Sequence, residues 1–442
     1  MKKILTGVLA FALLSTLAVA NGLNLNSLGS RALAMGGAFV GLADDFSAVY
    51  WNPAGLANFK TKAFGFYGTD IIPSSTYKLT VPPPYGTGQI IDAQSKTKHY
   101  LGGMAAYIHP ISENLVAAIG VYTPSGLGSD WPSEKLAFIS GNSTTIEWSS
   151  KVGLITIAPT LAYKVNDMLS IGAAVNINYG MFDLNMYAGK ADFQPYVTNF
   201  DLGQYSESET GWGLGATVGV LFKPHPMFSL GATFRTASTV KFSGSATISN
   251  LALLQQPSSS DMNRDVTWPA WVAVGAAFYP IEGLIITADV QYTNWKKIDV
   301  IKTVYKDTVW NSLMTASGKD VMPMYWNNAT QIRFGAEYKA SETLAFRAGY
   351  YVDPSPAPDK TMNILLPNYD FNVLTVGLGY NLNGLQIDLG FEYLMGKERI
   401  IDFVKTFNNP QNPFFDPEYA HAVPGTYTMK IIAPNISVSY KF

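Results

Sequence analysis

Several segments of this chain alternate strictly between apolar and polar residues. In 435–442 every second side chain is Ile, Val, Tyr or Phe, and the side chains between them are Asn, Ser, Ser and Lys. Segments 331–339 and 385–393 repeat this pattern. A period of two places alternate side chains on opposite faces of a β-strand, so the pattern predicts strands with one apolar and one polar face.

Fourteen such strands can be placed along the chain, joined by connections that alternate between short and long. We expect strands near 62–72, 98–109, 114–123, 149–164, 168–184, 210–223, 227–242, 267–280, 284–300, 328–339, 343–352, 370–381, 385–397 and 427–442. The short connections lie near 111–113, 166–167, 224–226, 281–283, 341–342 and 383–384. This rhythm is typical of outer-membrane barrels, whereas a soluble β-sandwich or propeller does not explain it. We therefore predict an all-β fold, a closed 14-stranded antiparallel transmembrane β-barrel with its apolar face toward lipid.

Composition and the N-terminus fit an exported membrane protein. Residues 1–20 combine two lysines, an apolar run and a small-residue ending, which predicts a signal peptide and a mature chain from Asn21. Removal of Lys2 and Lys3 leaves 28 basic against 32 acidic residues, a net charge of −4 that does not suit a nucleic-acid partner. The absence of cysteine excludes disulfides and thiolate metal sites, and we expect no metal and no cofactor.

Aromatic residues support the membrane assignment. We expect six tryptophans near strand ends to lie at the membrane interface, namely Trp212, Trp268, Trp271, Trp295, Trp310 and Trp326. The terminal Phe442, with Tyr440 two positions before it, resembles the ending of barrels inserted by the barrel assembly machinery. The predicted location is the outer membrane of a Gram-negative bacterium.

The predicted barrel is too wide for its own side chains to fill. About eight strands is the size at which wall side chains suffice. The sixth strand carries an inner face of Gly211, Gly213, Gly215 and Gly219, which leaves room for close approach. The segment 21–59 is the only sizeable one not assigned to strands, and we expect it to form a compact helical hatch inside the barrel formed by 60–442. The alternative is a loosely ordered periplasmic tail.

The sequence of the expected hatch contains helix start and stop signals. Ser30 is a candidate cap for a short helix over 32–35. Asp44 or Asp45 is a candidate cap for a second turn, and Pro53 forces the preceding residue into an extended conformation that ends it.

Six short motifs resemble the FadL/TodX family of outer-membrane transporters of long-chain fatty acids and other hydrophobic compounds. They are NGLNLN at 21–26, GSRALAMGGA at 29–38, ADD at 43–45, NPAGL at 52–56, TPSGL at 123–127 and PTLAY at 159–163. The resemblance implies a hatch whose motif residues are Asp44, Asp45, Asn52, Pro53 and Ala54. It also implies a ligand pocket near Asn21, Gly22 and Leu23, and an inward bend of the third strand at Pro124, Ser125 and Gly126 that opens a side window. Pro124 and Gly126 suit a break in a strand ladder, and a plain loop start is the alternative.

These features predict a passive transporter with hatch-gated binding and lateral release into the membrane. A ligand carboxylate would need a cation, and the candidates are Arg333, Arg347, Arg235 and Lys151; alternatively these residues pair with acidic residues of the lumen such as Glu337, Asp388 or Glu392. We expect a monomer whose partners are a fatty acid or hydrocarbon, outer-membrane lipids and lipopolysaccharide. A general diffusion porin and a transporter restricted to neutral aromatic hydrocarbons are the alternatives.

An enzyme is not expected, because the four histidines have no obvious serine and acid partners and no G-x-S-x-G occurs.

Overall fold

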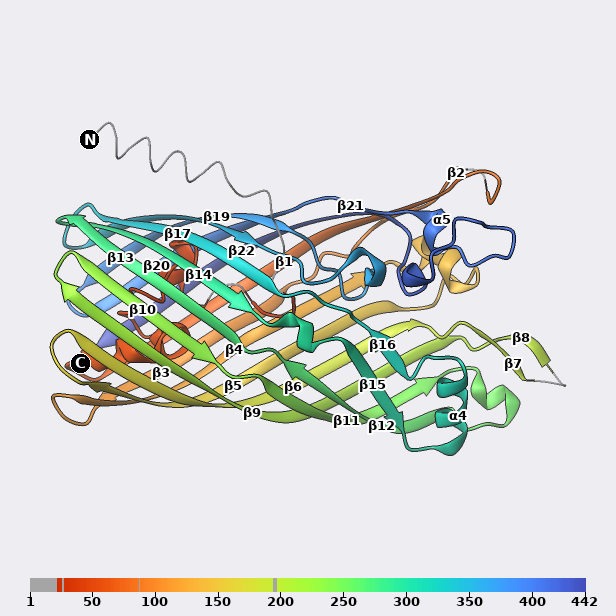
Figure 1. Ribbon diagram of the computed structural model, residues 1–442, viewed down its shortest axis with the longest axis horizontal. Helices are drawn as coiled ribbons and strands as arrows, with labels where there is room; N and C mark the ends of the chain where they lie inside the picture. The colour runs from red at the N-terminus through yellow and green to blue at the C-terminus, as the bar shows by residue number, and fades with distance from the viewer. Residues whose placement is uncertain (1–21, 26–27, 87, 194–196) are drawn as a thin grey trace.

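The computed structural model describes residues 22–442 except 26–27, 87 and 194–196. The predicted signal peptide, 1–20, and Asn21 lie outside the described residues. The chain forms a closed barrel of fourteen antiparallel strands, as the sequence predicts (Figure 1). The barrel closes where the first strand pairs with the last, with Ala63 opposite Lys441.

Some barrel strands are divided into two consecutive segments, namely β10 with β11, β12 with β13, β14 with β15, and β20 with β21. The wall segments are β1 (Ala63–Val81), β3 (Tyr100–Pro110), β4 (Leu115–Trp131), β5 (Trp148–Lys164), β6 (Leu169–Tyr187), β9 (Gln204–His225), β10 (Phe228–Arg235), β11 (Ser238–Ile248), β12 (Ser259–Trp268), β13 (Trp271–Ile281), β14 (Leu284–Thr293), β15 (Val300–Tyr305), β17 (Ala329–Lys339), β18 (Leu344–Asp353), β19 (Phe371–Leu382), β20 (Leu385–Gly396), β21 (Arg399–Ile401) and β22 (Gly425–Lys441).

The connections follow the predicted rhythm, with tight turns at one end and long loops at the other (Figure 1). The loops carry β2 (Gly88–Gln94), β7 (Lys190–Phe193), β8 (Val197–Asp201), β16 (Val321–Pro323), α4 (Thr308–Ala316) and α5 (Phe403–Thr406), together with the 3-10 turns η2 (Ser133–Lys135), η3 (Ala137–Ser140), η4 (Leu251–Leu254), η5 (Trp295–Lys297), η6 (Asp359–Thr361) and η7 (Pro417–Tyr419). In the described part of the chain, no helix is long and apolar enough to cross a membrane.

Several strands extend further toward the long loops than the alternation predicts. β1 continues to Val81; its residues 76–78 pair with both β2 and β22, and its last three residues pair with β2 alone. β9 likewise begins at Gln204, six residues before the predicted position. Beyond the bilayer the outer face need not be apolar, so the backbone ladder continues after the hydrophobic signal has ended.

The tryptophan prediction is wrong for five of the six residues. Trp212 is 58% exposed on the outer face, but the other five are buried inside the molecule. Four of these belong to one apolar cluster, which is formed by the long-loop side of the lumen and by the loops: Trp268, Trp295, Trp310 and Trp326. A tryptophan near a strand end therefore marks an apolar lumen here, not the lipid interface.

The described part of the hatch, residues 22–25 and 28–59, lies inside the barrel, and most of it fills the lumen near the tight-turn end (Figure 1). It contains α2 (Ser30–Ala34), α3 (Ala48–Trp51) and η1 (Pro53–Asn58), and all three are almost wholly buried. The predicted Ser30 cap is wrong: Gly29 occupies the cap position, and the Ser30 amide donates to Ser437 Oγ on the wall at 2.8 Å.

Nine wall glycines, each on a different strand, leave room for the hatch. A Cβ added at Gly231 would lie 2.0 Å from the Val40 carbonyl oxygen, and one at Gly219 would lie 2.1 Å from Asn52 Oδ1. The others are Gly65, Gly120, Gly172, Gly275, Gly335, Gly349 and Gly377. The expectation of close approach is therefore confirmed at Gly219. At Gly211, Gly213 and Gly215 the approaching atoms belong to neighbouring wall residues instead.

We predict that Gly231→Ala loosens the hatch. The new methyl group would overlap the hatch backbone, and overpacking of this kind costs about 1–3 kcal/mol. Arg31 is the only trypsin site between Gly22 and Phe59, so the rate of cleavage after it should rise several-fold. Gly68→Ala is the matched control, because Gly68 contacts only Phe66 on the outer face. Equal cleavage rates in the two variants would contradict the prediction.

Candidate ligand pocket and hatch

The Asn-Pro-Ala motif joins two hatch segments to the wall. The Asn52 amide donates to the Val40 carbonyl at 2.9 Å and to the Val220 carbonyl of β9 at 3.0 Å. Its oxygen accepts from the Ala54 amide at 3.2 Å, and Pro53 begins η1. Asn52 is fully buried, so these bonds satisfy backbone groups that water does not reach. The motif lies against β9 and β10, away from Gly126.

The two aspartates of the hatch have different partners. Asp45 Oδ1 accepts from the Ser47 amide at 2.8 Å and from the Ser47 hydroxyl at 2.6 Å, which orders the turn before α3. Burial raises the pKa of Asp45 to about 6, and the nearby Arg31 opposes this effect. Asp44 binds Arg31 directly.

A chain of alternating charges fixes the hatch to the wall near the tight-turn end. Arg31 donates two hydrogen bonds to Glu337, from Nε to Oε2 at 2.7 Å and from Nη2 to Oε1 at 2.9 Å. Arg31 also forms an ion pair with Asp44. Glu337 Oε2 accepts from Arg347 Nε at 2.6 Å, and Arg347 Nη1 donates to Asp388 at 2.7 Å. The Glu337 side chain is only 1% exposed. We call these five residues the ion-pair chain.

The first described residues, Gly22 to Leu25, form an arm that pairs with β4. The Leu25 amide donates to the Pro124 carbonyl at 2.9 Å, and the Gly126 amide donates to the Leu23 carbonyl at 3.2 Å. The Ser125 hydroxyl also donates to the Leu23 carbonyl and accepts from Trp268 Nε1 at 3.0 Å. Of the predicted pocket residues, Leu23 is thus in direct contact with Ser125 and Gly126 of the predicted kink, whereas Asn21 is not described.

The β4 ladder is irregular where the arm binds. Tyr122 pairs with Thr156 of β5 but Ser125 pairs with Leu154, so three steps along β4 match two along β5, as in a β-bulge. β4 continues to Trp131, whereas its pairing with β3 ends at Tyr122 opposite Met104.

Leu25 occupies the position where β3 and β4 part. Its methyl groups lie 3.3 Å from a Cβ built on Gly102 of β3 and 3.6 Å from one built on Gly126 of β4. An added side chain at either glycine would meet the arm. The arm therefore packs between the two strands where their ladder ends.

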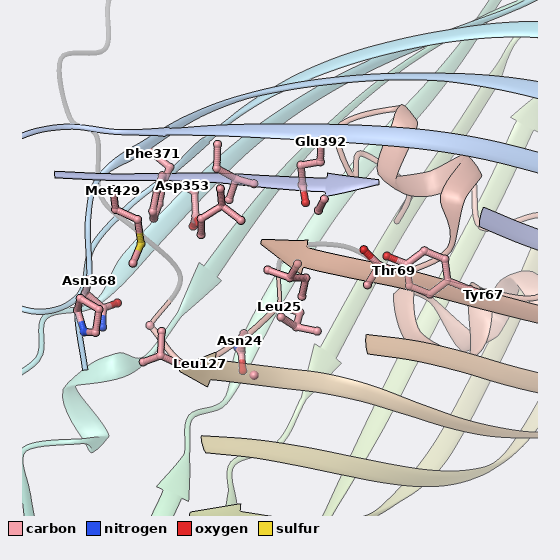
Figure 2. Close-up of a pocket in the computed structure, with 17 residues that line it drawn as sticks. Asn24, Leu25, Tyr67, Thr69, Leu127, Asp353, Asn368, Phe371, Glu392 and Met429 are labelled. Carbon is pink, nitrogen blue, oxygen red and sulfur yellow. The ribbon is translucent and has the colours of Figure 1, made fainter. Parts of the chain in front are cut away.

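A cavity of about 100 Å³ lies beside the arm (Figure 2). Its wall includes Gly22, Asn24 and Leu25 of the arm and Gly126 of β4. The other lining residues are Tyr67, Thr69, Ile71, Leu127, Asp353, Pro367, Asn368, Phe371, Glu392, Leu394, Met429, Ile431 and Ala433. The arm and the adjoining residues of β4 thus form one side of this pocket.

The four predicted carboxylate contacts do not line this pocket. Arg347 belongs to the ion-pair chain, and Arg333 donates to the Gly36 carbonyl at 3.0 Å and to Gln331 at 2.8 Å. Lys151 alternates with the lumen-facing residues of β5 and lies exposed on the outer face, so the expectation of an inner-wall position is wrong. The remaining candidate is Arg235.

Arg235 keeps a charge that no described carboxylate neutralises within 4 Å. It donates to Thr217 at 3.1 Å and to the Tyr50 carbonyl at 3.0 Å, and its guanidinium stacks 4.5 Å from the Tyr50 ring. It lines a cavity of about 30 Å³ that also contacts Asn24. Among the described residues, no group of histidine, aspartate and glutamate side chains is arranged to hold a metal ion.

A larger cavity of about 450 Å³ opens among the long loops. Its apolar wall includes Leu202, Met314 and Met322, and its polar wall includes Arg264 and Lys319. Burial lowers the pKa of Lys319, whose ammonium group donates to the Ala188 carbonyl. An amphipathic molecule arriving from the long-loop side would meet this cavity before the arm.

Sequence comparison assigns the whole architecture to one family. Residues 11–442 match the family described as outer membrane protein transport protein (OMPP1/FadL/TodX). The chain belongs to this family. Its members are transport proteins of the outer membrane, which places this protein in the outer membrane of a Gram-negative bacterium. Its substrates are therefore of the hydrophobic class that FadL/TodX-type transporters carry.

Relatives and solved structures cover nearly the full length. Outer membrane protein P1 of Haemophilus influenzae is 22% identical over 448 residues, covering 92% of this chain and 94% of that one. A FadL homologue from Pseudomonas aeruginosa superposes with a TM-score of 0.76 at 16% identity, covering 96% and 100% of the two chains. The toluene transporter TodX of Pseudomonas putida gives 0.68 at 17% identity, covering 95% and 99%. At these identities the structures show a shared fold.

Three features of the site could not be found from the motifs. Leu25 belongs to a quoted motif, but only the structure shows its position between two glycines of different strands. Glu392 and Asp353 lie on inner faces of alternating strands, which marks them as lumen residues without indicating a pocket. Trp268 reaches Ser125 across the lumen, a contact that local sequence does not encode.

Proposed function

We propose that this protein takes up hydrophobic compounds passively, with the arm gating the pocket and the ligand leaving sideways into the membrane. The observation that carries the proposal is the double role of the arm. Gly22 to Leu25 form part of the pocket wall and also pair with the irregular segment of β4. Displacement of the arm would therefore open the pocket and free the space between β3 and β4 in one step.

The need for a moving gate follows from the strength of hydrophobic binding. Burial of a methylene gains about 0.8 kcal/mol, so fifteen methylenes would gain on the order of 12 kcal/mol. A ligand held that tightly leaves slowly unless a second state binds it less well. The arm has few backbone bonds to break, whereas the hatch body is anchored by the ion-pair chain.

A general diffusion porin, the first alternative, does not suit the packed lumen. A Cβ added at any of the nine wall glycines would lie within 2.9 Å of a backbone or side-chain atom of the hatch, so a methyl group would not fit. Small polar solutes would need a continuous water-filled path, which the hatch blocks while it stays in place.

Two substrate classes are supported by different observations. Neutral hydrophobic compounds suit the pocket beside the arm, because no lysine, arginine or histidine lines it. The fold is shared with proteins named toluene transporter and monoaromatic hydrocarbon channel. Fatty acids are the second candidate, and Arg235 supports them because its charge has no described carboxylate partner within 4 Å.

Uptake by outer-membrane vesicles with a lipopolysaccharide outer leaflet tests the proposal. We expect labelled oleate and toluene to enter faster than through vesicles without the protein, while a small sugar does not. Competition between oleate and toluene identifies the preferred class. If the intact protein passes the sugar as readily as oleate, the proposal fails. A variant lacking residues 21–58 serves as the open-barrel control.

A further inference from the structure

The pocket beside the arm contains two acidic side chains, and no basic side chain lines it. Glu392 of β20 and Asp353 of β18 are 6% and 2% exposed, and both line the cavity (Figure 2). A buried acidic group is costly unless hydrogen-bond donors or a cation surround it. The chemistry of these two groups therefore constrains what else can enter the pocket.

Both acidic groups accept hydrogen bonds from the protein. The Tyr351 hydroxyl donates to Glu392 Oε1 at 2.5 Å, and Gln331 Nε2 donates to Asp353 Oδ1 at 2.5 Å. Glu392 forms no ion pair within 4.0 Å of any lysine, arginine or histidine in the described ranges. Its remaining acceptor capacity lies at the edge of the pocket, since a carboxylate offers about four acceptor positions.

Further polar groups lie at the same end of the pocket. The Tyr67 hydroxyl is fully buried and makes no hydrogen bond within 3.5 Å to any described residue, although the Thr69 hydroxyl lies near it. Figure 2 shows Tyr67, Thr69 and Glu392 toward the same side of the cavity. An unpartnered buried hydroxyl is unfavourable, and a polar group on a ligand would satisfy it.

Apart from Asn24, Asp353 and Asn368, the rest of the wall is apolar, and the space is small. Leu25, Leu127, Phe371 and Met429 surround the other part of the cavity. Its volume of about 100 Å³ is of the same order as the roughly 150 Å³ of an engineered cavity that binds benzene, and far below what an extended acyl chain needs. A compact, ring-sized apolar body fits this scale better than an extended chain.

Electrostatics decide which head group the pocket accepts. A ligand carboxylate beside the buried Glu392 would place two like charges together, which disfavours their ionised forms. A hydroxyl or ammonium group would instead donate to Glu392, and hydrogen bonds to a charged acceptor are the stronger kind.

We propose that the pocket beside the arm selects compact apolar compounds carrying a hydrogen-bond-donating head group, an alcohol or an amine, with Glu392 as the acceptor. The proposal rests on the proposed function and names the ligand class of its pocket. Within that class the hydroxyl and ammonium forms share the same contact with Glu392, and the experiment below separates them.

Four ring compounds of matched size test this selection: toluene, benzyl alcohol, benzylamine and benzoate. Calorimetric titration of the full protein in lipid nanodiscs, corrected with empty nanodiscs, gives each affinity. We expect at least one of benzyl alcohol and benzylamine to bind about tenfold more tightly than toluene, and benzoate to bind more weakly than toluene. The compound whose affinity exceeds that of toluene by more, benzyl alcohol or benzylamine, shows whether the pocket prefers a hydroxyl or an ammonium group.

Substitution of the acceptor provides the second readout. Glu392→Gln should lower the affinity for the preferred donor compound about tenfold, and its affinity for toluene should stay within twofold of that of the unmodified protein. Asp92→Asn, which changes an exposed acidic residue of β2, should leave all four affinities unchanged. If Glu392→Gln does not fold, the affinities of the four compounds for the unmodified protein still test the proposed selection.

Equal affinities for toluene and both donors, or tightest binding of benzoate, would overturn the selection while leaving the proposed transport intact. Absence of binding by all four compounds would also overturn it. The proposed function itself fails only if vesicle uptake of both oleate and toluene fails.

Discussion

Replacing Arg31 by alanine is expected to convert the closed barrel into an ion-conducting pore. Arg31 is the hatch residue of the ion-pair chain that contacts the wall, and it donates two hydrogen bonds to Glu337. The substitution leaves the buried Glu337 with Arg347 alone and removes the partner of Asp44. Breaking a buried pair in this way costs about 3–5 kcal/mol. A loss of 3 kcal/mol raises the population of an unlatched hatch about a hundredfold, since each 1.4 kcal/mol is a factor of ten.

Single-channel conductance in planar bilayers measures this effect. We expect rare openings in the unmodified protein and frequent openings in Arg31→Ala. The opening frequency of Arg31→Lys should lie between these two, because a lysine ammonium keeps the positive charge but does not reproduce the two hydrogen bonds to Glu337. The matched control is Lys164→Ala, which removes an exposed pair with Asp167 at a tight turn and should change nothing measurable. Conductance of Arg31→Ala equal to that of this control would contradict the role of the ion-pair chain.

The barrel was predictable because lipid on one side and a polar lumen on the other impose the alternation directly on the sequence. Segment 385–393 shows this, since its apolar residues face outward and Asp388 and Glu392 face inward. The prediction failed where the lumen itself becomes apolar. The ring centroids of Trp295 and Trp326 lie 5.2 Å apart in the apolar cluster on the long-loop side of the lumen. Nothing in the local sequence of either tryptophan distinguishes this buried position from one at the lipid interface.

The candidate site was predictable only in outline. The motifs identified the hatch and the irregular segment around Ser125, but not which groups meet there. The contact of Asn52 with Val220 and that of the arm with β4 join segments more than a hundred residues apart. Such contacts depend on the register of the whole barrel, which accumulates over many strands and is not encoded near either residue.

Locking the arm to β4 is expected to abolish uptake. Asn24 and Ser125 face each other as an antiparallel pair flanked by two backbone hydrogen bonds, Leu25 to Pro124 and Gly126 to Leu23. A pair of this kind has Cα atoms roughly 4.5 Å apart, which is within the range that a disulfide spans. The chain has no cysteine of its own, so the double variant Asn24→Cys, Ser125→Cys can form a single intramolecular bond.

Uptake by this double variant, oxidised and then reduced, is the most direct test of arm gating. The single variants control for loss of the Ser125 hydroxyl bonds to Leu23 and Trp268. We predict that oxidation lowers vesicle uptake of oleate and toluene at least tenfold, that a reductant restores it, and that neither treatment affects the single variants. Unchanged uptake in a fully cross-linked preparation would show that the ligand passes without movement of the arm, and would contradict the account.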